Sequence, residues 1–333
     1  MYETFYNLKS KPFELTPDPR FIYFTEGHRE ALSSMVYAIR ERKGFLALCG
    51  EVGTGKTTLV HALLDLLEKV GILSAFIFNP TLSRSEFFEC LLAEFNLKCD
   101  FVSKVQALNK LNALLLERYR QGRITVLIID EAQNLSDDIL EEIRLLTNLE
   151  TSAEKLLQII LVGQPELSAR LDALNLRQLK QRISLRCSLE PLTLSDTAEY
   201  IRTRLQIAGL QNQEIFSDAC IAQIHRCSGG IPRLVNTICD NALVTGFAAD
   251  LETIDVEIID EVVGDLRLAS EQKPDLFQET GTVKVARERP PENPLWTRAE
   301  GIRKKFKVAY VQTQGQPEQD KASTQSSPAE PKP

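Results

Sequence analysis

The sequence has little of what three classes of protein require. It contains three histidines, and its seven cysteines are an odd number without a Cys-x-x-Cys pair. We therefore expect buried free thiols, Cys49 among them, and neither a disulfide framework nor a structural metal site. The longest apolar run, residues 156–162, is interrupted by Gln158 and falls short of the roughly 18 residues of a membrane span. No basic leader followed by an apolar segment stands at the N-terminus, so we expect a cytoplasmic protein.

The charge is acidic overall but unevenly distributed. A formal charge of −7 argues against a broad polyphosphate-binding surface and leaves room for a local basic stripe. Residues 281–333 hold ten Lys or Arg against six Asp or Glu, so this tail is +4 and the remainder −11. The tail is rich in Pro, Gln and Ser, and we expect it to be mostly disordered. Its basic segment 302–308 is interpreted as a solvated linker in preference to a docking peptide.

The order of strand-like and helix-like segments predicts an α/β fold. Five short β-type runs, at 45–49, 74–79, 124–130, 156–162 and 184–189, alternate with amphipathic segments of helical length. This alternation predicts a parallel five-stranded sheet sandwiched by helices. After Pro191 the chain reads as helices alone, at 196–208, 218–227, 232–249 and 256–268, with Ser195 and Ser217 as expected N-caps. We expect an α/β domain over 1–192, an all-α domain over 193–269 and a tail over 270–333.

A phosphate loop stands between the first strand and the following helix. The segment from Gly50 to Thr57 matches G-x-x-x-x-G-K-[ST] in full and in the strand-to-helix context that the motif requires. Its glycines let backbone N–H groups face phosphate oxygens, Lys56 is expected to bridge the β- and γ-phosphates, and the Thr57 hydroxyl to ligate Mg²⁺. The expected nucleotide contacts are Gly50, Glu51, Val52, Gly53, Thr54, Gly55, Lys56, Thr57 and Thr58.

Two carboxylates end the third strand-like run. We expect Asp130 to hold the metal through water and Glu131 to orient the attacking water near the γ-phosphate. Two amides end neighbouring runs. Gln164 is a candidate phosphate sensor, and Asn79 either restrains Glu131 before activation or simply caps its strand.

Three arginines extend this prediction. Arg177 and Arg182 precede the last strand, and one of them, preferably Arg182, is a candidate finger for a neighbour's γ-phosphate if the protein forms a ring. Arg233 begins a helix of the second domain, where we expect it to close over the nucleotide and report its γ-phosphate. In isolation such arginines are usually solvated helix charges.

Taken together, the motifs resemble those of the AAA+ ATPases, and within them the general secretion pathway protein A (ExeA-like) family. The resemblance runs from Met1 to about Leu268 and is far more specific than a phosphate loop alone. It rests on Pro12-Phe13, Pro17-Asp18-Pro19, His28 with Glu30-Ala31-Leu32, the loop with Thr58, Asp130-Glu131-Ala132-Gln133, Gly163-Gln164-Pro165-Glu166-Leu167, Leu176-Arg177-Gln178-Leu179, Gln181-Arg182-Ile183 and Gly230-Ile231-Pro232-Arg233.

The resemblance implies a set of roles. Residues 12–28 would wrap the adenine, and Gln164, Arg182 and Arg233 would match sensor 1, the arginine finger and sensor 2. ATP and Mg²⁺ would be the cofactors, and the protein would associate with itself in a nucleotide-dependent oligomer. Family members energise assembly of secretion or pilus machinery, so a membrane-associated partner at the inner face of the membrane is expected. This sequence shows no membrane helix or peptidoglycan-binding domain after the ATPase region, which makes direct wall contact doubtful.

Two alternatives stay open at this stage. Related AAA+ proteins load partners onto DNA during transposition, and a DNA-associated regulator is therefore the second reading, although no DNA-reading helix stands out. The third is a nucleotide switch with little turnover, which Glu131 disfavours.

Overall fold

The computed structural model describes residues 1–14, 19–78, 81–98, 103–211 and 213–268, all of which belong to one compact unit. Asn79, the tail and its basic segment 302–308 lie outside the described residues. The expectations for them therefore stay predictions.

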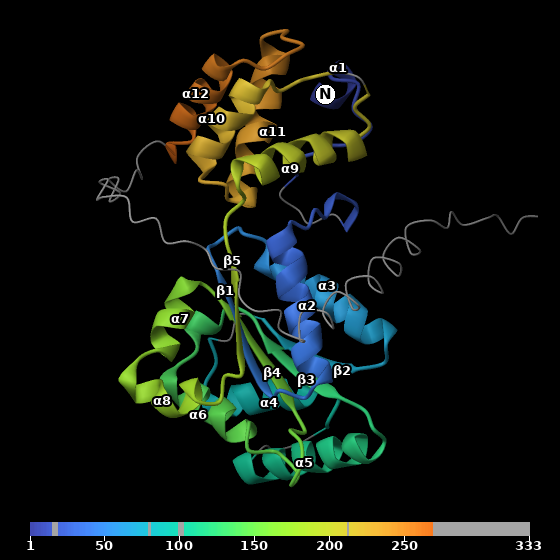
Figure 1. The fold of residues 1–333 in the computed structure, drawn as a ribbon, viewed down its shortest axis with the longest axis vertical. Helices are drawn as coiled ribbons and strands as arrows, with labels where there is room; N and C mark the ends of the chain where they lie inside the picture. Colours follow the sequence, from blue (N-terminus) through green and yellow to red (C-terminus); the bar gives the residue numbers. More distant parts are fainter. Residues whose placement is uncertain (15–18, 79–80, 99–102, 212, 269–333) are drawn as a thin grey trace, which may run out of the picture. The chain divides into compact units, whose positions relative to one another are not determined.

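The α/β part is built on a parallel five-stranded sheet, as the alternation of segments predicts (Figure 1). The strand order is β2-β3-β4-β1-β5, so the strand before the phosphate loop and the strand before Asp130 flank β4. The carboxyl ends of parallel strands meet at one edge of the sheet. This edge therefore gathers the loop, the carboxylates and Gln164. The strands are β1 (Phe45–Gly50), β2 (Leu73–Ile77), β3 (Thr125–Ile129), β4 (Gln158–Gly163) and β5 (Leu185–Leu189).

Helices cover both faces of the sheet because alternate strand residues are apolar on both sides. One face packs against α2 and α3, and the other against α4 and α7, with α6 packed on α4 and α8. β3 and β4 are buried along their whole length, as expected of central strands. The helices are α2 (Glu26–Arg40), α3 (Lys56–Lys69), α4 (Arg84–Glu94), α5 (Lys104–Arg120), α6 (Asp137–Leu146), α7 (Pro165–Leu171) and α8 (Arg177–Lys180).

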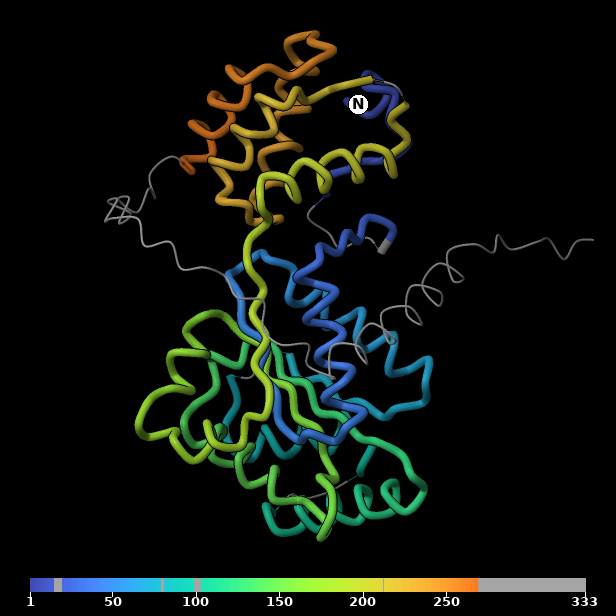
Figure 2. Tube along the Cα trace, in the orientation of Figure 1, coloured from blue at the N-terminus to red at the C-terminus, as the bar shows by residue number. Residues whose placement is uncertain are grey.

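The helical part that follows Pro191 has its own hydrophobic cluster. Its helices are α9 (Leu194–Ile207), α10 (Asp218–Ser228), α11 (Pro232–Ala248) and α12 (Val256–Asp265). The same cluster contains the N-terminal side chains Tyr2, Tyr6, Leu8, Phe13 and Phe21. Figure 2 shows the N-terminal segment running beside these helices, and α1 (Tyr2–Phe5) packs on α11. The start of the chain is thus part of the core of the helical part, which we call the lid.

A buried arginine holds the N-terminal segment on the lid. Arg204 of α9 is 7% exposed, and its Nε donates to the Pro12 carbonyl at 2.5 Å. Its guanidinium lies 5.0 Å from the centre of the Phe21 ring and 5.3 Å from that of Tyr200. The charge therefore has a hydrogen-bond acceptor and two aromatic faces in place of water.

Several element boundaries differ from the prediction by a few residues. The predicted Ser195 cap is wrong: α9 begins at Leu194 with Thr193 as its N-cap. Asp196 lies three residues after Thr193, so the side chain of each residue bonds to the backbone of the other in a reciprocal capping box. Ser195 has Ala198 at the same spacing, which cannot form such a box. Ser217 caps α10 as predicted. Strand β4 begins two residues later than predicted, at Gln158, whose side-chain oxygen accepts from the Gly44 N–H at 2.8 Å.

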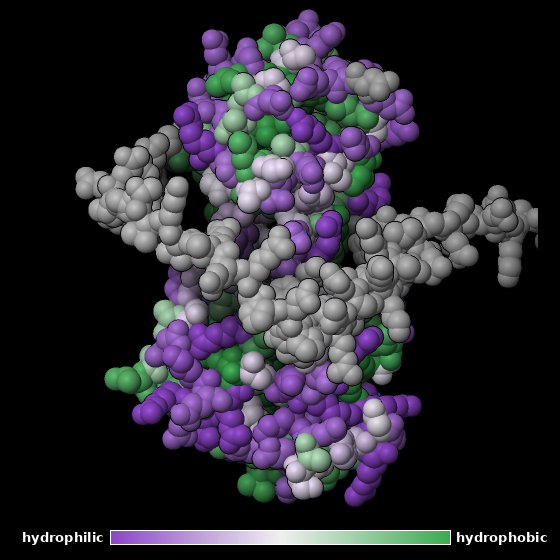
Figure 3. Space-filling view, viewed as in Figure 1, coloured by the Kyte–Doolittle hydropathy of each residue, from purple (hydrophilic) through white to green (hydrophobic). Residues whose placement is uncertain are grey.

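The visible surface is mainly hydrophilic, with apolar residues in small separate groups (Figure 3). Within the described part of the chain, none of the helices combines the length and the apolar character that a bilayer span requires.

Candidate functional site

The phosphate loop curls at the end of β1, as its glycines require. Gly53 and Gly55 have φ of 83° and 97°, in the left-handed region that favours glycine. Gly50 has another reason to lack a side chain, since a Cβ there would lie 2.8 Å from the Leu189 carbonyl oxygen. Thr54 is buried, and its hydroxyl donates to the Glu51 carbonyl at 2.8 Å. The loop is thus braced from within and leads directly into the N-terminus of α3.

Lys56 opens α3 and folds back across the loop. Its Nζ donates to the Gly50 carbonyl at 2.8 Å and to the Glu51 carbonyl at 2.9 Å. Burial lowers the pKa of Lys56, while the nearby Glu131 and Asp130 carboxylates act in the opposite direction. A buried ammonium group beside a glycine-rich loop suits a polyanionic ligand.

The structure brings the two expected metal-binding side chains into contact. The Thr57 hydroxyl donates to Asp130 Oδ2 at 3.0 Å, although the residues are 73 positions apart. Asp130 is fully buried, and burial raises its pKa, while hydrogen bonds from the Glu131 N–H and Thr57 oppose this. A hydroxyl and a carboxylate at this distance are oxygen ligands of the kind that Mg²⁺ uses together with phosphate oxygens.

Glu131 follows β3 in an unusual backbone conformation. Its φ of 51° and ψ of 36° are left-handed, which is uncommon for a residue with a side chain. The Glu131 carboxylate accepts hydrogen bonds from Gln133 and, at 3.3 Å, from the Gln164 amide. The candidate sensor and the candidate water-directing acid therefore touch. Gln133 belongs to the family motif that contains Glu131, but the sequence assigns it no role. Its contacts make it a further residue of the site.

His28 is a second residue whose contact with the site was not foreseen. It is 5% exposed, with Nδ1 at 2.7 Å from the Thr25 hydroxyl and Nε2 at 2.9 Å from the Thr54 carbonyl oxygen. The ring also lies against Gly55, where a Cβ would approach Nε2 to 3.0 Å. Burial lowers the pKa of His28. The expectation that residues 12–28 wrap an adenine is untested and stays a prediction.

The lid meets the loop through the first turn of α11. The Arg233 N–H donates to the Gly53 carbonyl at 3.3 Å, and a Cβ on Gly53 would lie 2.8 Å from Arg233 Cβ and 2.9 Å from Ile231. The backbone and Cβ of Arg233 therefore lie next to the phosphate loop, and the rest of its side chain is exposed. Its role as a sensor remains a prediction.

The candidate finger residues lie at the other edge of the sheet. Arg182 is exposed, precedes β5 and donates to the Asn148 amide oxygen at 3.0 Å. Arg177, also exposed, begins α8. Because β1 and β5 are parallel and in register, Arg182, just before β5, is separated from the loop by the length of a strand, about 17 Å for five residues.

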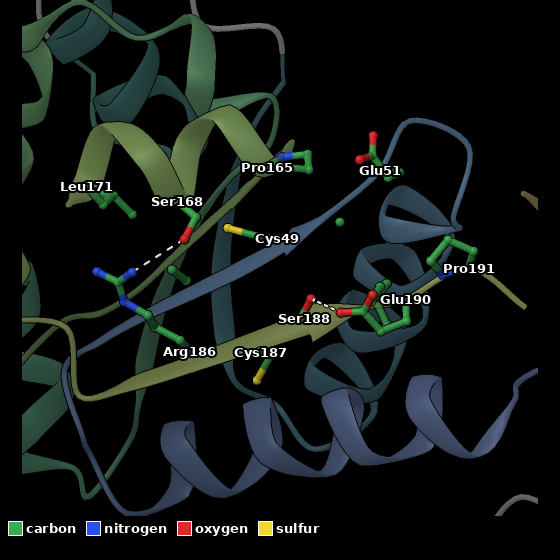
Figure 4. A pocket seen from close by; sticks show the side chains of 13 residues that line it. Cys49, Glu51, Pro165, Ser168, Leu171, Arg186, Cys187, Ser188, Glu190 and Pro191 are labelled. Atoms are coloured by element: carbon green, nitrogen blue, oxygen red, sulfur yellow. Dashed lines mark hydrogen bonds between the residues drawn. The ribbon is translucent and has the colours of Figure 1, made fainter. Parts of the chain in front are cut away.

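A pocket of about 370 Å³ borders the loop on another side (Figure 4). Its walls come from α7, β1 and β5, and of the loop residues named above only Gly50 and Glu51 line it. Figure 4 shows Cys49 pointing toward Ser168 and Cys187 pointing to the opposite side of the sheet. Both thiols are free but half-buried, so the expectation that Cys49 is buried is wrong, and among the described cysteines it is Cys220 and Cys239 that are buried. Partial burial raises the pKa of both thiols, that of Cys187 to about 11.

The remaining expected contacts are placed as follows. Glu51 and Val52 are exposed at the loop tip, and Thr58 is half-buried in the first turn of α3. Around these, the donor set fits a nucleoside triphosphate with a divalent cation: backbone N–H groups, one buried ammonium group and the Thr57–Asp130 oxygen pair.

Comparisons of sequence relate the chain to known proteins. A family model for the AAA domain matches residues 39–171. General secretion pathway protein A of Aeromonas hydrophila is 42% identical over 271 residues, which are 81% of this chain and 48% of that protein. The chain thus spans about half the length of this relative.

Solved structures share the fold at low sequence identity. The ORC2 protein of Aeropyrum pernix, in ADPNP-ADP complexes, superposes with a TM-score of 0.55 at 16% identity, over 77% of this chain and 72% of that one. Drosophila ORC bound to DNA superposes with a TM-score of 0.57 at 19% identity, over 77% of this chain and 64% of that one. Cdc6p of Pyrobaculum aerophilum superposes with a TM-score of 0.54 at 19% identity, over 75% of this chain and 71% of that one. These similarities concern the fold. The family model and the 42% identity show that the chain belongs to the AAA+ P-loop NTPases, in the family of general secretion pathway protein A.

Proposed function

We propose that the protein binds ATP with Mg²⁺ and hydrolyses it. The observation that supports this most directly is the contact between Thr57 and Asp130, because it joins the phosphate loop to the carboxylate strand and leaves Glu131 as the next residue. A bound Mg²⁺ ion would neutralise charge that develops on the phosphate oxygens. Lys56 would bind the β- and γ-phosphates, and Glu131 would orient the attacking water and accept its proton.

Two variants test the assigned chemistry. Lys56→Ala should abolish nucleotide binding, whereas Glu131→Gln should bind ATP normally and lose about 10²-fold or more in phosphate release. Binding is measured by calorimetry and turnover by a phosphate-release assay. Glu89→Gln, an exposed α4 residue, is the matched control and should behave as wild type. Wild-type turnover in Glu131→Gln would refute the role of this acid, and a wild type without turnover would favour the nucleotide switch.

We further propose that hydrolysis takes place in a nucleotide-dependent oligomer. Arg182 and Arg177 are both exposed, and Arg182 lies a strand's length from the loop of its own molecule, so either would act on the nucleotide of a neighbouring copy. A trans arginine stabilises charge in the transition state and raises turnover by roughly 10³-fold or more.

Mixing two inactive variants tests this arrangement. Arg182→Ala has an intact loop, and Lys56→Ala has an intact arginine, so mixed assemblies should regain turnover that neither variant shows alone. The same experiment with Arg177→Ala decides between the two arginines. If neither mixture recovers activity, catalysis in trans is wrong.

We propose that the energy of hydrolysis serves assembly or remodelling of a protein complex in the secretion or envelope machinery. The support is the 42% identity to general secretion pathway protein A. The protein would then act from the cytoplasm, at the inner face of the membrane, through a membrane-associated partner.

A trapped state identifies the client. ATP-loaded Glu131→Gln, used as bait, should retain an envelope protein that Lys56→Ala does not. Retention of duplex DNA, with an affinity that falls steeply with salt, would instead support the DNA-associated reading.

A further inference from the structure

We propose that Gln133 is a positioning residue that holds the Glu131 carboxylate and couples it to Gln164. This deepens the proposed hydrolysis, since it concerns how the water-directing acid is oriented. Gln133 lies in the short 3₁₀ turn η2 (Ala132–Asn134) directly after Glu131. Its side-chain amide bridges two residues: Nε2 donates to Glu131 Oε2, and Oε1 accepts from the Gln164 backbone N–H at 3.1 Å.

The orientation of this amide follows from its partners. A backbone N–H can only donate, so the atom of Gln133 that faces Gln164 must be the carbonyl oxygen. The amide nitrogen is then directed at Glu131, which as a carboxylate can only accept. Only one orientation of the amide therefore satisfies both groups. A flipped amide would place its nitrogen against the Gln164 N–H and its oxygen against the Glu131 carboxylate, which are a donor–donor and an acceptor–acceptor contact.

The backbone around the bridge is adapted to it. Glu131 adopts a left-handed conformation, which is unfavourable for a residue with a side chain and persists only where surrounding contacts hold it. This turn brings Gln133 back beside Glu131 and the end of β4. At that end, Gly163 leaves the space that the amide occupies, because a Cβ there would lie 2.7 Å from Gln133 Oε1.

The bridge constrains one side of the carboxylate. Gln133 and Gln164 both donate to Glu131 Oε2. Among the described residues neither amide donates to Oε1, so this oxygen keeps its capacity to accept a hydrogen bond from water. A carboxylate fixed by one oxygen presents the other in a defined direction, and a misplacement of about 1 Å at a reacting group can cost 10²-fold in rate.

The bridge also couples two parts of the site. Gln164 follows β4 and is the candidate sensor of the γ-phosphate, and its backbone is tied to the same amide that holds Glu131. A shift of Gln164 on binding the γ-phosphate would therefore move the acid with it. Gln133 needs no contact with nucleotide for this role.

The test separates rate from binding. Gln133→Leu removes both hydrogen bonds at similar volume and should lower kcat about 10- to 100-fold while the KM for ATP stays within about twofold. Gln133→Glu removes the donor, adds a like charge and should lower kcat at least as much. Asn134→Leu, an exposed amide in the same turn, is the matched control and should keep the wild-type kcat. A kcat that is unchanged or raised in Gln133→Leu, or a KM that rises with the loss, overturns the proposal.

A double variant tests whether Gln133 acts through Glu131. In a Glu131→Gln background, adding Gln133→Leu should lower the residual rate no further, because residues that act as a unit are not additive. Multiplying effects would overturn the proposal.

A measurement that does not depend on turnover distinguishes failure of the Gln133 bridge from failure of the proposed ATP hydrolysis. A wild type without turnover would count against the function alone. The side-chain amide signals of Gln133 in NMR spectra should then shift and exchange faster with solvent in Glu131→Ala than in wild type, and unchanged signals would overturn the bridge.

Discussion

His28 shows how one buried side chain supports the phosphate loop. Both ring nitrogens have partners: the Thr25 hydroxyl faces Nδ1, and Nε2 faces the Thr54 carbonyl. A carbonyl can only accept, so Nε2 bears the proton and Nδ1 accepts from Thr25. The neutral tautomer therefore satisfies every contact, and a second proton on Nδ1 would leave Thr25 without its acceptor.

This arrangement predicts a loss of stability in mild acid. Burial lowers the pKa of His28 in the folded state, against the opposing effects of its bond to Thr54 and of the Asp196 charge. The unfolded chain then binds the extra proton first, so the free energy of unfolding falls as pH drops below the ordinary histidine pKa of about 6.5. His28→Gln keeps a donor near Thr54 and removes the titration.

Urea unfolding at pH 8 and pH 5.5 checks this prediction. Wild type should lose more stability than His28→Gln between the two pH values, and equal losses would show that His28 does not contribute to the pH dependence.

At the scale of elements, the start of α9 shows how local rules compete. Ser195 and Thr193 are both residues that cap helices; Asp196 directly follows Ser195 and lies three residues after Thr193. Thr193 wins because Asp196 lies at its third helical position, where the carboxylate accepts from the Thr193 N–H at 3.2 Å and the Asp196 N–H donates to the Thr193 hydroxyl at 3.1 Å. The helix therefore begins earlier than the hydrophobic periodicity indicates.

Substitution of each residue in turn measures how much Thr193 and Ser195 contribute as the helix cap. Thr193→Ala should lower the free energy of unfolding by about 1 kcal/mol, because it removes the cap. Ser195→Ala, an exposed position inside the first turn, should change it by less than about 0.5 kcal/mol. Urea denaturation gives both values, and a larger effect at Ser195 would contradict the observed cap.

At the scale of the whole molecule, the N-terminal segment joins parts that are distant in sequence. Its aromatic side chains complete the hydrophobic cluster of the lid, and Arg204 fixes Pro12 and Phe21 to α9. Farther along, His28 contacts the phosphate loop, and Arg233 of the lid contacts the same loop. The loop is therefore in touch with the lid directly through Arg233 and also with the residues that follow the N-terminal segment.

Substitutions of two arginines on α9, one buried and one exposed, compare the contribution of this packing to stability with that of a surface charge. Arg204→Ala should lower the free energy of unfolding by about 3 kcal/mol, because it removes buried hydrogen bonds made by a charged group. It should also make the N-terminal residues susceptible to limited proteolysis. Arg202, two residues away, forms an exposed ion pair with Asp218, and Arg202→Ala should cost no more than about 1 kcal/mol. Equal effects of the two substitutions would contradict the role assigned to Arg204.

The sequence by itself determined the fold class and the identity of the main site. Strand runs bounded by turns, a complete phosphate-loop motif and two carboxylates after a buried strand are local signals, which can be recognised without knowing the distant contacts. The prediction of a parallel five-stranded sheet with a helical part after Pro191 is confirmed. A residue's nearest chain neighbours were sufficient to show this much.

Only the tertiary structure decided which distant residues meet. The strand order places β4 between β1 and β3, and this order brings Gln164 to Glu131. The bridge by Gln133, the burial of His28 beneath the loop and the packing of the N-terminal segment in the lid all join residues through space. Periodicity and motif spacing report local geometry, whereas these contacts depend on how strands and helices are ordered and packed, which no local pattern records.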